Sequence, residues 1–275
     1  MNRSTVDCVV VTWDGKDKPL GLIHFDAEPQ FKLVLFDFSG AAAKPEIDGY
    51  TGPFDYISRK TECKGQVIQL TAEYLTGTAL DYHYLGQIDD DVHLRVSGIN
   101  YALYLGHTYR LDAFSPALSI DSHFSHAPML AIDRSILRRV TWVEIMMPFY
   151  RKELFEIIAP ACADSVSAWG VDNYLVPTLQ MLHDMTRTAM VDAVVARHSR
   201  SLSSGLRTYS NGLTAPQEAV AMKARSMKMI ADARPDLIGT AWYKEVFEGG
   251  KNPLVASYRR IRDGLVRRRA RRRWI

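Results

Sequence analysis

Short apolar runs rich in β-branched residues alternate along most of this chain with segments of helical periodicity. Such alternation favours a mainly parallel sheet whose two faces are covered by helices. We therefore expect an α/β fold in which ligands bind beyond the carboxyl ends of the strands. The predicted strands are 7–13, 31–38, 82–88, 117–120, 129–132 and 191–196, and the predicted helices are 64–75, 96–105, 153–158, 172–185, 215–233 and 253–265.

Length and composition narrow the class of protein. With 275 residues the chain can form one large α/β domain or two small ones. No apolar run reaches the roughly 18 residues of a membrane span, and the polar start at 1–7 predicts no secretory signal. Cys8, Cys63 and Cys162 form no CxxC pair, so we expect reduced thiols in a cytoplasmic protein rather than disulfides or a zinc site.

The charge of the chain is unevenly distributed. Nine arginines and one aspartate follow from Arg259 onward, a local charge of +8 against a net +3, which leaves −5 for the remainder. We therefore divide the chain into a catalytic domain at 1–252 and a basic amphipathic tail at 253–275, with Trp274 and Ile275 as apolar anchors. Such a tail suits an anionic membrane surface. Nucleic-acid binding is the less favoured rival, and a solvated tail without a partner is the third possibility.

Residues 89–91 are three consecutive aspartates directly after the strand predicted at 82–88. Adjacent carboxylates repel one another, so a folded protein tolerates them best where a cation or solvent neutralises them. At the end of an extended strand, Asp89 and Asp91 would point the same way and Asp90 the opposite way. Two carboxylates on one side suit Mg²⁺ or Mn²⁺, which complete their shell with substrate phosphate oxygens. The alternative is an acidic surface turn.

Two later positions also carry chemistry. Asp172 ends the segment Trp-Gly-Val-Asp at the start of a predicted helix, where a carboxylate also serves as an ordinary complement to the helix dipole. His198 follows the strand predicted at 191–196 and is flanked by Arg197 and Arg200. Two neighbouring guanidiniums favour the neutral imidazole, which is the form that binds metals. A structural or merely exposed histidine is the alternative.

Several segments, in the same order, resemble the plant and bacterial family called domain of unknown function 707, which is similar to GT-A glycosyltransferases. The resemblance covers about residues 30–200, although this chain is shorter and lacks the family's tryptophan-containing stretch near Lys64. The most specific segments are VEIMMPF and WGVD. The segments are 35–40 (LFDFSG), 60–75, 84–92 (YLGQIDDDV), 143–149 (VEIMMPF), 169–172 (WGVD) and, more weakly, 115–118 (SPAL) with His123 and His126.

The resemblance implies roles for the acidic cluster and for His198. Asp89 and Asp91 match a DxD motif, with Asp91 the direct ligand of Mn²⁺ or Mg²⁺ and Asp89 closer to the ribose or sugar. Asp90 is expected to contact the substrate as well. His198 lies where GT-A enzymes often supply a further metal ligand.

The resemblance also implies a catalytic and an acceptor side. Asp172 matches the general base of inverting GT-A enzymes, and Trp169 and Gly170 are expected to bind substrate beside it. Glu144 either lines the acceptor side as a second catalytic carboxyl or supports another polar group. Lys64 could contact the diphosphate, as could Arg59 and Lys60, whereas ordinary helix-surface charge is the alternative for all three basic residues.

These patterns predict a metal-dependent, inverting glycosyltransferase of GT-A-like (Rossmann-like) fold. A nucleoside diphosphate leaves well only when a cation neutralises its phosphates, and a carboxylate must accept the proton of the acceptor hydroxyl. The predicted partners are a nucleotide-sugar donor and a glycan or lipid-linked acceptor of surface polysaccharide assembly, on the inner face of the cytoplasmic membrane. The alternatives are another Mg²⁺-dependent nucleotidyl- or phosphoryl-transfer enzyme and a non-catalytic nucleic-acid-binding protein. P-loop, HEXXH, GxSxG and GxGxxG patterns do not occur.

Overall fold

The computed structural model describes residues 5–201 and 205–249 of the chain. The predicted boundary at 252, the basic tail at 253–275 and its predicted helix therefore lie outside the described residues. Within the described part no helix is both long enough and apolar enough to cross a membrane.

One large sheet runs through the described part of the chain, with nine strands in the order β2-β6-β10-β7-β9-β5-β1-β3-β4 and β8 added to β10. Its centre is parallel, because β1 pairs in parallel with both β3 and β5. The strands are β1 (Val6–Trp13), β2 (Ile23–His24), β3 (Lys32–Asp37), β4 (Phe54–Ser58), β5 (Tyr82–Ile88), β6 (Val92–Arg95), β7 (Ala113–Leu118), β8 (Arg138–Arg139), β9 (Phe149–Arg151) and β10 (Thr188–His198).

The sheet contains antiparallel pairs as well as the parallel pairs that were predicted to dominate it. The short strand β9 lies antiparallel between β5 and β7, and β10 pairs antiparallel with β6 and β8. The strand predicted at 129–132 is wrong: a 3₁₀ turn at Ala127–Met129 occupies its start, and only a single bridge joins Leu130 to Leu118. Pro128 favours the start of such a helical turn, because its fixed φ suits the turn and its missing amide is not needed there.

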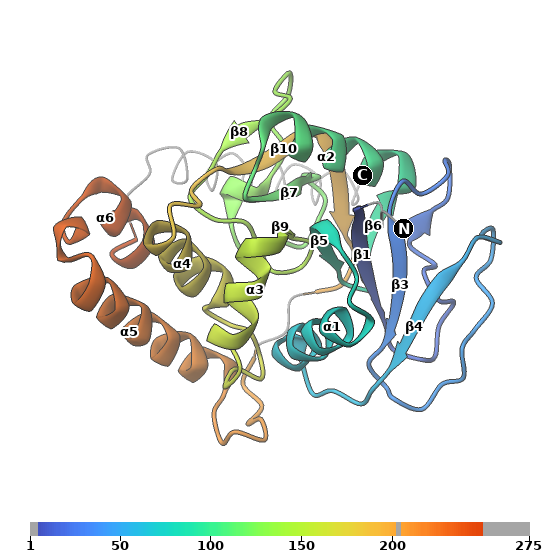
Figure 1. The fold of residues 1–275 in the computed structure, drawn as a ribbon, viewed down its shortest axis with the longest axis horizontal. Coiled ribbons are helices and arrows are strands. Elements are labelled where there is room, and N and C mark those ends of the chain that lie inside the picture. Colours follow the sequence, from blue (N-terminus) through green and yellow to red (C-terminus); the bar gives the residue numbers. More distant parts are fainter. Residues whose placement is uncertain (1–4, 202–204, 250–275) are drawn as a thin grey trace, which may run out of the picture.

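Helices cover both faces of the sheet. From β5, the Tyr84 hydroxyl donates to the Gly106 carbonyl of α2, whereas the Gln87 amide donates to Thr71 of α1. Because side chains three residues apart on a strand point to opposite faces, α2 covers one face and α1 the other, where α3 and α4 also pack (Figure 1). The helices are α1 (Lys64–Thr78), α2 (Val96–Tyr109), α3 (Lys152–Ala161), α4 (Val176–Leu182), α5 (Ala215–Ala233) and α6 (Ala241–Phe247).

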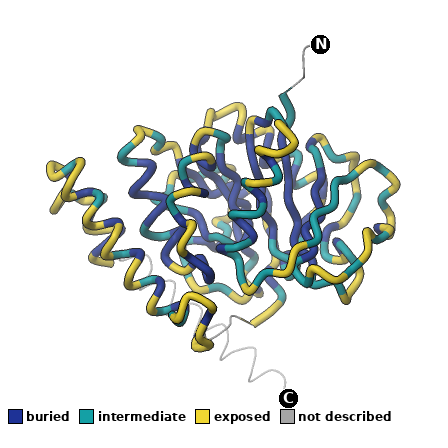
Figure 2. The backbone as a smooth tube through the Cα atoms, turned by 60° about the horizontal axis from the view of Figure 1, so that its bottom comes forward, coloured by how far each residue is buried: buried dark blue, intermediate teal, exposed yellow. Residues whose placement is uncertain are grey.

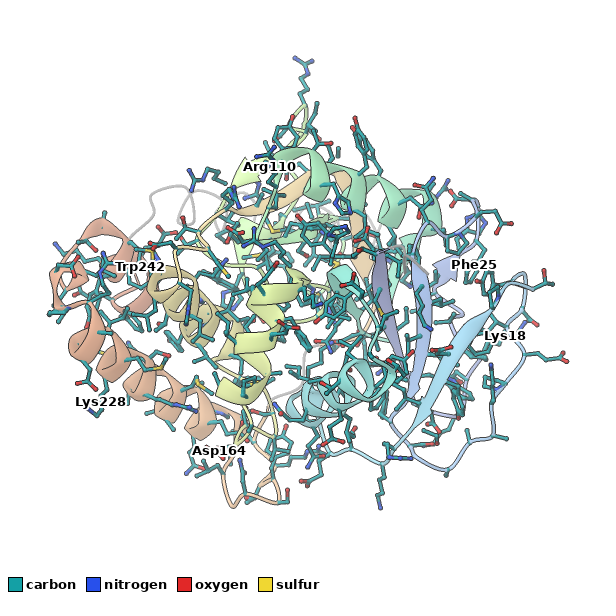
Figure 3. The ribbon with its side chains drawn as sticks, viewed as in Figure 1. Lys18, Phe25, Arg110, Asp164, Lys228 and Trp242 are labelled. Atoms are coloured by element: carbon teal, nitrogen blue, oxygen red, sulfur yellow. The ribbon has the colours of Figure 1, made fainter. Side chains whose placement is uncertain are left out.

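The buried core follows the strands, and the outer helices α5 and α6 carry a separate small cluster of buried apolar side chains at one end. Figure 2 shows the strands as the buried centre and a largely exposed outer helix α5. In Figure 3, Lys18 and Phe25 lie at the end that carries β3 and β4, and Lys228 and Trp242 lie at the opposite end. The helix predicted at 215–233 is confirmed with the same bounds, beginning at the capping box of Thr214 and Gln217.

Candidate active site

The three aspartates form a tight turn between β5 and β6. The Val92 amide donates to the Asp89 carbonyl at 3.2 Å, so the chain no longer has the alternation of a strand at this point. The prediction that Asp89 and Asp91 point together and Asp90 away assumed an extended strand, and it stays a prediction. Asp90 and Asp91 share one cationic partner, Arg200, whereas Asp89 turns to Lys64 at the start of α1.

Each aspartate of the turn already meets a positive side chain of the protein. Lys64 donates to Asp89 Oδ1, and the Lys64 side chain is only 9% exposed. Arg200 Nη2 lies 3.2 Å from Asp90 Oδ2, and Arg200 Nη1 lies 3.9 Å from Asp91 Oδ2. Arg59 and Lys60, the other two basic residues predicted as possible contacts of the diphosphate, form no ion pair with the aspartates among the described residues. Arg59 donates instead to the Ser58 carbonyl.

His198 is the last residue of β10 and lies against Asp91. Its Nε2 is 3.2 Å from Asp91 Oδ2, and its Nδ1 is 2.7 Å from the His123 carbonyl oxygen. Because a carbonyl only accepts, Nδ1 carries a proton and Nε2 is the nitrogen that faces Asp91. Of the two predicted histidines of the weaker segment, His123 therefore contributes its backbone, and His126 packs on Trp142.

The expected effect of the flanking arginines on His198 is wrong. Burial lowers the pKa of His198, but the hydrogen bonds with Asp91 and the His123 carbonyl outweigh it, and the net shift is upward. The guanidiniums act elsewhere, since Arg197 pairs with Asp121 at 3.2 Å and Arg200 pairs with the aspartate turn. The carboxylate of Asp91, rather than the two arginines, therefore dominates the electrostatics of this imidazole.

The donor set at Asp91 and His198 fits a divalent cation with two protein ligands. Asp91 Oδ1 is buried and has no hydrogen-bond partner in the described part of the structure. A carboxylate and an imidazole suit Mn²⁺, which can take its remaining ligands from phosphate oxygens and water. Asp89 is held by Lys64, and the described residues contain no group of three acidic, histidine or cysteine side chains arranged for a metal.

Asp172 and Glu144 are two buried carboxyl groups near the start of α4. Asp172 lies in the π-helical turn Val171–Leu175, which continues directly into α4. The helix predicted at 172–185 therefore begins one residue earlier in the structure and ends at Leu182. Its carboxyl accepts from the amides of Ile145 at 3.2 Å and Asn173 at 2.8 Å. Burial nevertheless raises the pKa of Asp172 to about 6.

Glu144 lies beside Asp172 in the chain segment that enters β9. Burial, followed by the like charge of Asp172, raises the pKa of Glu144 to about 8. Its Oε2 is buried without a hydrogen-bond partner among the described residues. The two predicted catalytic carboxyls are therefore neighbours, and the pKa of Glu144 is raised further than that of Asp172.

Gly170 and Trp169 hold the turn that carries Asp172. Gly170 has φ +89°, and a Cβ there would come within 3.0 Å of the backbone of Ala219 in α5. Only glycine combines that left-handed conformation with so close an approach. Trp169 is 40% exposed, and its ring lies beside Gly205.

Glu218 of α5 was missed by the sequence reasoning. Its buried carboxylate accepts hydrogen bonds from the hydroxyls of Ser165 and Ser167, from backbone amides at 166 and 167, and from Asn211. These bonds shape the segment that leads into Trp169. The N-terminal end of α1 rests on the same segment, because a Cβ at Gly65 would lie 2.0 Å from the Ser165 carbonyl oxygen. Lys64 and Asp172 are thus positioned by one connected support.

Replacing Glu218 with alanine is expected to destabilise the protein by about 3 kcal/mol, since several buried donors lose a charged acceptor. Burial opposes ionisation, but the hydrogen bonds lower the net pKa of Glu218. A lowered pKa means that the carboxylate stabilises the fold above its unfolded pKa, and that this contribution disappears as the pH falls through the folded value. Urea unfolding of the Glu218→Ala and wild-type proteins at pH 7 and pH 4 measures both effects. Equal stability at pH 7 would contradict the assigned support.

A cavity of about 370 Å³ opens beside the aspartate turn, at the carboxyl ends of β1 and β5. Thr12 of β1 accepts a hydrogen bond from the Asp90 amide at 3.0 Å, which ties the two strand ends together. The cavity is lined by Val11, Thr12, Trp13, Asp14, Asp17, Lys18, Leu20, Gly21, Leu22, Ile23, Asp89, Asp90, Val92 and Arg200.

Comparison with solved structures identifies the fold. The structure of residues 1–349 of S. aureus TarS in complex with UDP-GlcNAc matches with a TM-score of 0.54 over 84% of this chain and 68% of that one, at 9% identity. GalNAc-T7 with UDP, GalNAc and Mn²⁺ matches with a TM-score of 0.52 over 95% of this chain and 55% of that one, at 11% identity. Both are GT-A glycosyltransferases. The chain has the GT-A fold.

The GT-A fold was the class expected from the sequence, and the similarity shows no more than the fold at these levels of identity. A longer S. aureus TarS structure matches with a TM-score of 0.55 and 11% identity over 84% of this chain, which spans 40% of that chain. No protein-family model and no curated protein sequence matches the chain. The resemblance to domain of unknown function 707 therefore stays a prediction.

Proposed function

We propose that this protein is a metal-dependent glycosyltransferase that uses a nucleotide-sugar donor. The observation that carries the proposal is the convergence of Asp91 and His198 beside a cavity at the strand ends of a GT-A fold. Asp91 comes from the turn after β5 and His198 from the end of β10, and one oxygen of Asp91 has no other partner. In the proposal these two side chains would hold Mn²⁺ or Mg²⁺, which when bound would supply charge neutralisation for the leaving diphosphate.

The other side chains then have separate tasks. The cavity receives the nucleotide, and Lys64 holds Asp89 in a fixed position at its edge. Trp169 and Gly170 border the sugar or acceptor. Asp172 accepts the proton of the acceptor hydroxyl as the oxygen attacks the anomeric carbon from the face opposite the diphosphate, so the product has inverted configuration. Glu144, neutral at pH 7, can donate a hydrogen bond to a substrate oxygen.

The acceptor in this proposal is a glycan or a lipid-linked saccharide of surface polysaccharide assembly. That part rests on the arginine-rich segment 253–275, which suits an anionic membrane surface and lies outside the described residues. A cytoplasmic location, peripheral to the membrane, belongs to the same proposal.

A thermal-shift panel tests the function. We expect at least one of UDP-, GDP-, CMP- or dTDP-sugars to raise the melting temperature only when Mn²⁺ is present. At about 100 times the dissociation constant the ligand adds about 2.7 kcal/mol, which corresponds to several degrees for a domain of this size. Mn²⁺ alone and each nucleotide alone are the controls. Stabilisation by nucleoside triphosphates but by no sugar nucleotide would instead favour a nucleotidyl- or phosphoryl-transfer enzyme.

A further inference from the structure

Arg200 contacts the aspartate turn from outside β10. It lies two residues after His198, its side chain is 57% exposed, and it forms part of the wall of the cavity beside the turn. Its guanidinium reaches Asp90 Oδ2 at 3.2 Å and Asp91 Oδ2 at 3.9 Å. The guanidinium of Arg200, at the end of a long flexible side chain, therefore lies against the carboxylates at which a divalent ion is proposed to bind.

The same oxygen of Asp91 meets two positive groups. Asp91 Oδ2 faces both His198 Nε2 at 3.2 Å and Arg200 Nη1 at 3.9 Å, whereas Oδ1 has no partner in the described part of the chain. A divalent cation arriving at this carboxylate would lie within a few ångströms of the guanidinium. Like charges at that separation repel, so the cation and the present position of Arg200 compete.

The backbone beside Arg200 is fixed even though its side chain is exposed. The amide and the hydroxyl of Ser199 both donate to the Asp91 carbonyl, at 2.9 and 3.0 Å. Movement of the guanidinium therefore needs only side-chain rotation about a tethered main chain. The side chains of Asp90 and Asp91 are only 17% and 15% exposed, so Arg200 can leave them at little cost only when another cation takes its place.

A diphosphate is the partner that suits a displaced guanidinium in this cavity. The planar fork of arginine donates two parallel hydrogen bonds to phosphate oxygens, and such bonds are among the strongest in proteins. The cavity wall otherwise carries carboxylates at Asp14, Asp17, Asp89 and Asp90, which repel a bare diphosphate, and Lys18 is already paired with Asp48.

We propose that Arg200 exchanges partners: it neutralises Asp90 and Asp91 in the free enzyme and binds the diphosphate of the donor once a divalent cation occupies Asp91. The inference rests on the proposed function. It makes Arg200 a donor-binding residue that also weakens the binding of metal to the empty site. An ion pair that never opened would neutralise Asp90 and Asp91 but would not bind the diphosphate.

The two roles predict effects of opposite sign for Arg200→Gln. In calorimetric titrations at moderate salt, Mn²⁺ alone should bind the variant at least threefold more tightly than the wild type. UDP and GDP, titrated with saturating Mn²⁺, should bind the variant at least tenfold more weakly. Arg200→Lys keeps the charge without the fork, so it should restore the wild-type Mn²⁺ affinity but recover the nucleotide affinity only in part.

Arg197→Gln is the matched control. Arg197 lies near the same end of β10, but it pairs with Asp121 rather than with the aspartate turn. This variant should change neither affinity by more than twofold, and all variants should melt within a few degrees of the wild type. Nucleotide affinity that is unchanged in Arg200→Gln, or metal and nucleotide affinities that fall together, would overturn the exchange. A wild-type protein that, with Mn²⁺, binds neither UDP nor GDP nor any sugar nucleotide of the thermal-shift panel would overturn the proposed function along with the exchange, so the two failures are distinguishable.

Discussion

Replacing Asp172 by asparagine should lower the turnover of sugar transfer by about 10²–10⁴-fold, the usual contribution of a general base. The carboxyl is buried in the π-helical turn and positioned by the amides of Ile145 and Asn173. Asparagine keeps the shape and one acceptor oxygen but cannot accept the proton of the attacking hydroxyl. Turnover measured with saturating donor and Mn²⁺ tests this, and near wild-type turnover would remove Asp172 from the mechanism.

The pH dependence identifies which of the two carboxyls is the base. Because burial raises the pKa of Asp172 to about 6, the group is protonated and inactive below that pH, and turnover should rise as the pH passes 6 and then level off. A base at Glu144 would move the inflection to about 8. The pH profile of turnover between pH 5 and pH 9 separates these outcomes.

Glu144→Gln is the matched control for Asp172→Asn. Glu144 is protonated at pH 7, so glutamine resembles its prevailing form and should keep turnover within about tenfold of the wild type. The inflection near pH 6 should persist in this variant. If Glu144→Gln loses turnover as completely as Asp172→Asn, the assignments of base and hydrogen-bond donor must be exchanged.

Asp91→Asn should abolish the metal response of the protein. The carboxylate is one of the two proposed protein ligands, and the amide that replaces it carries no charge for the cation. We expect the apparent affinity for Mn²⁺ to fall at least about 100-fold and turnover at saturating donor to fall about 10³-fold, as expected when several kcal/mol of charge stabilisation are lost. Turnover measured against Mn²⁺ concentration gives both numbers.

Asp89→Asn is the informative comparison, since Asp89 belongs to the same turn but is paired with Lys64. It should lower the affinity for the donor more than the affinity for Mn²⁺. If the two variants impair Mn²⁺ binding equally, Asp89 is a direct ligand and the two-ligand assignment is incorrect. If neither does, the proposed metal site is absent from this turn.

The principal strands and helices could be predicted because their signals are local. The strand predicted at 82–88 and the helix predicted at 215–233 have the same bounds in the structure, and β1, β3 and α1 differ by a few residues. Apolar periodicity and capping residues act within one element, so they can be recognised without knowing the fold. The same reasoning placed the aspartates at the carboxyl end of a strand, which is where the cavity lies.

The failures involve interactions between distant segments. The three-residue strand β9 is defined by its pairing with β5 on one side and β7 on the other, and three residues carry no recognisable period. Glu218 lies in the first turn of α5, where a carboxylate is common, and only the packing of that helix brings it to Ser165 and Ser167. Arg200 was expected to act on the charge of His198, but its guanidinium pairs with Asp90 and Asp91. Proximity in sequence to His198 says little about where a long side chain ends.

By itself the sequence determined the α/β class, the order of most elements and the residues able to do the chemistry, since periodicity and side-chain type are properties of short segments. Only the tertiary structure decided which of those residues meet: Asp91 with His198, Asp89 with Lys64, and Asp90 with Arg200. Pairing of this kind depends on the turn geometry after β5 and on where β10 and α1 come to lie. Those positions are set by packing across the whole sheet, which depends on residues far apart in the chain.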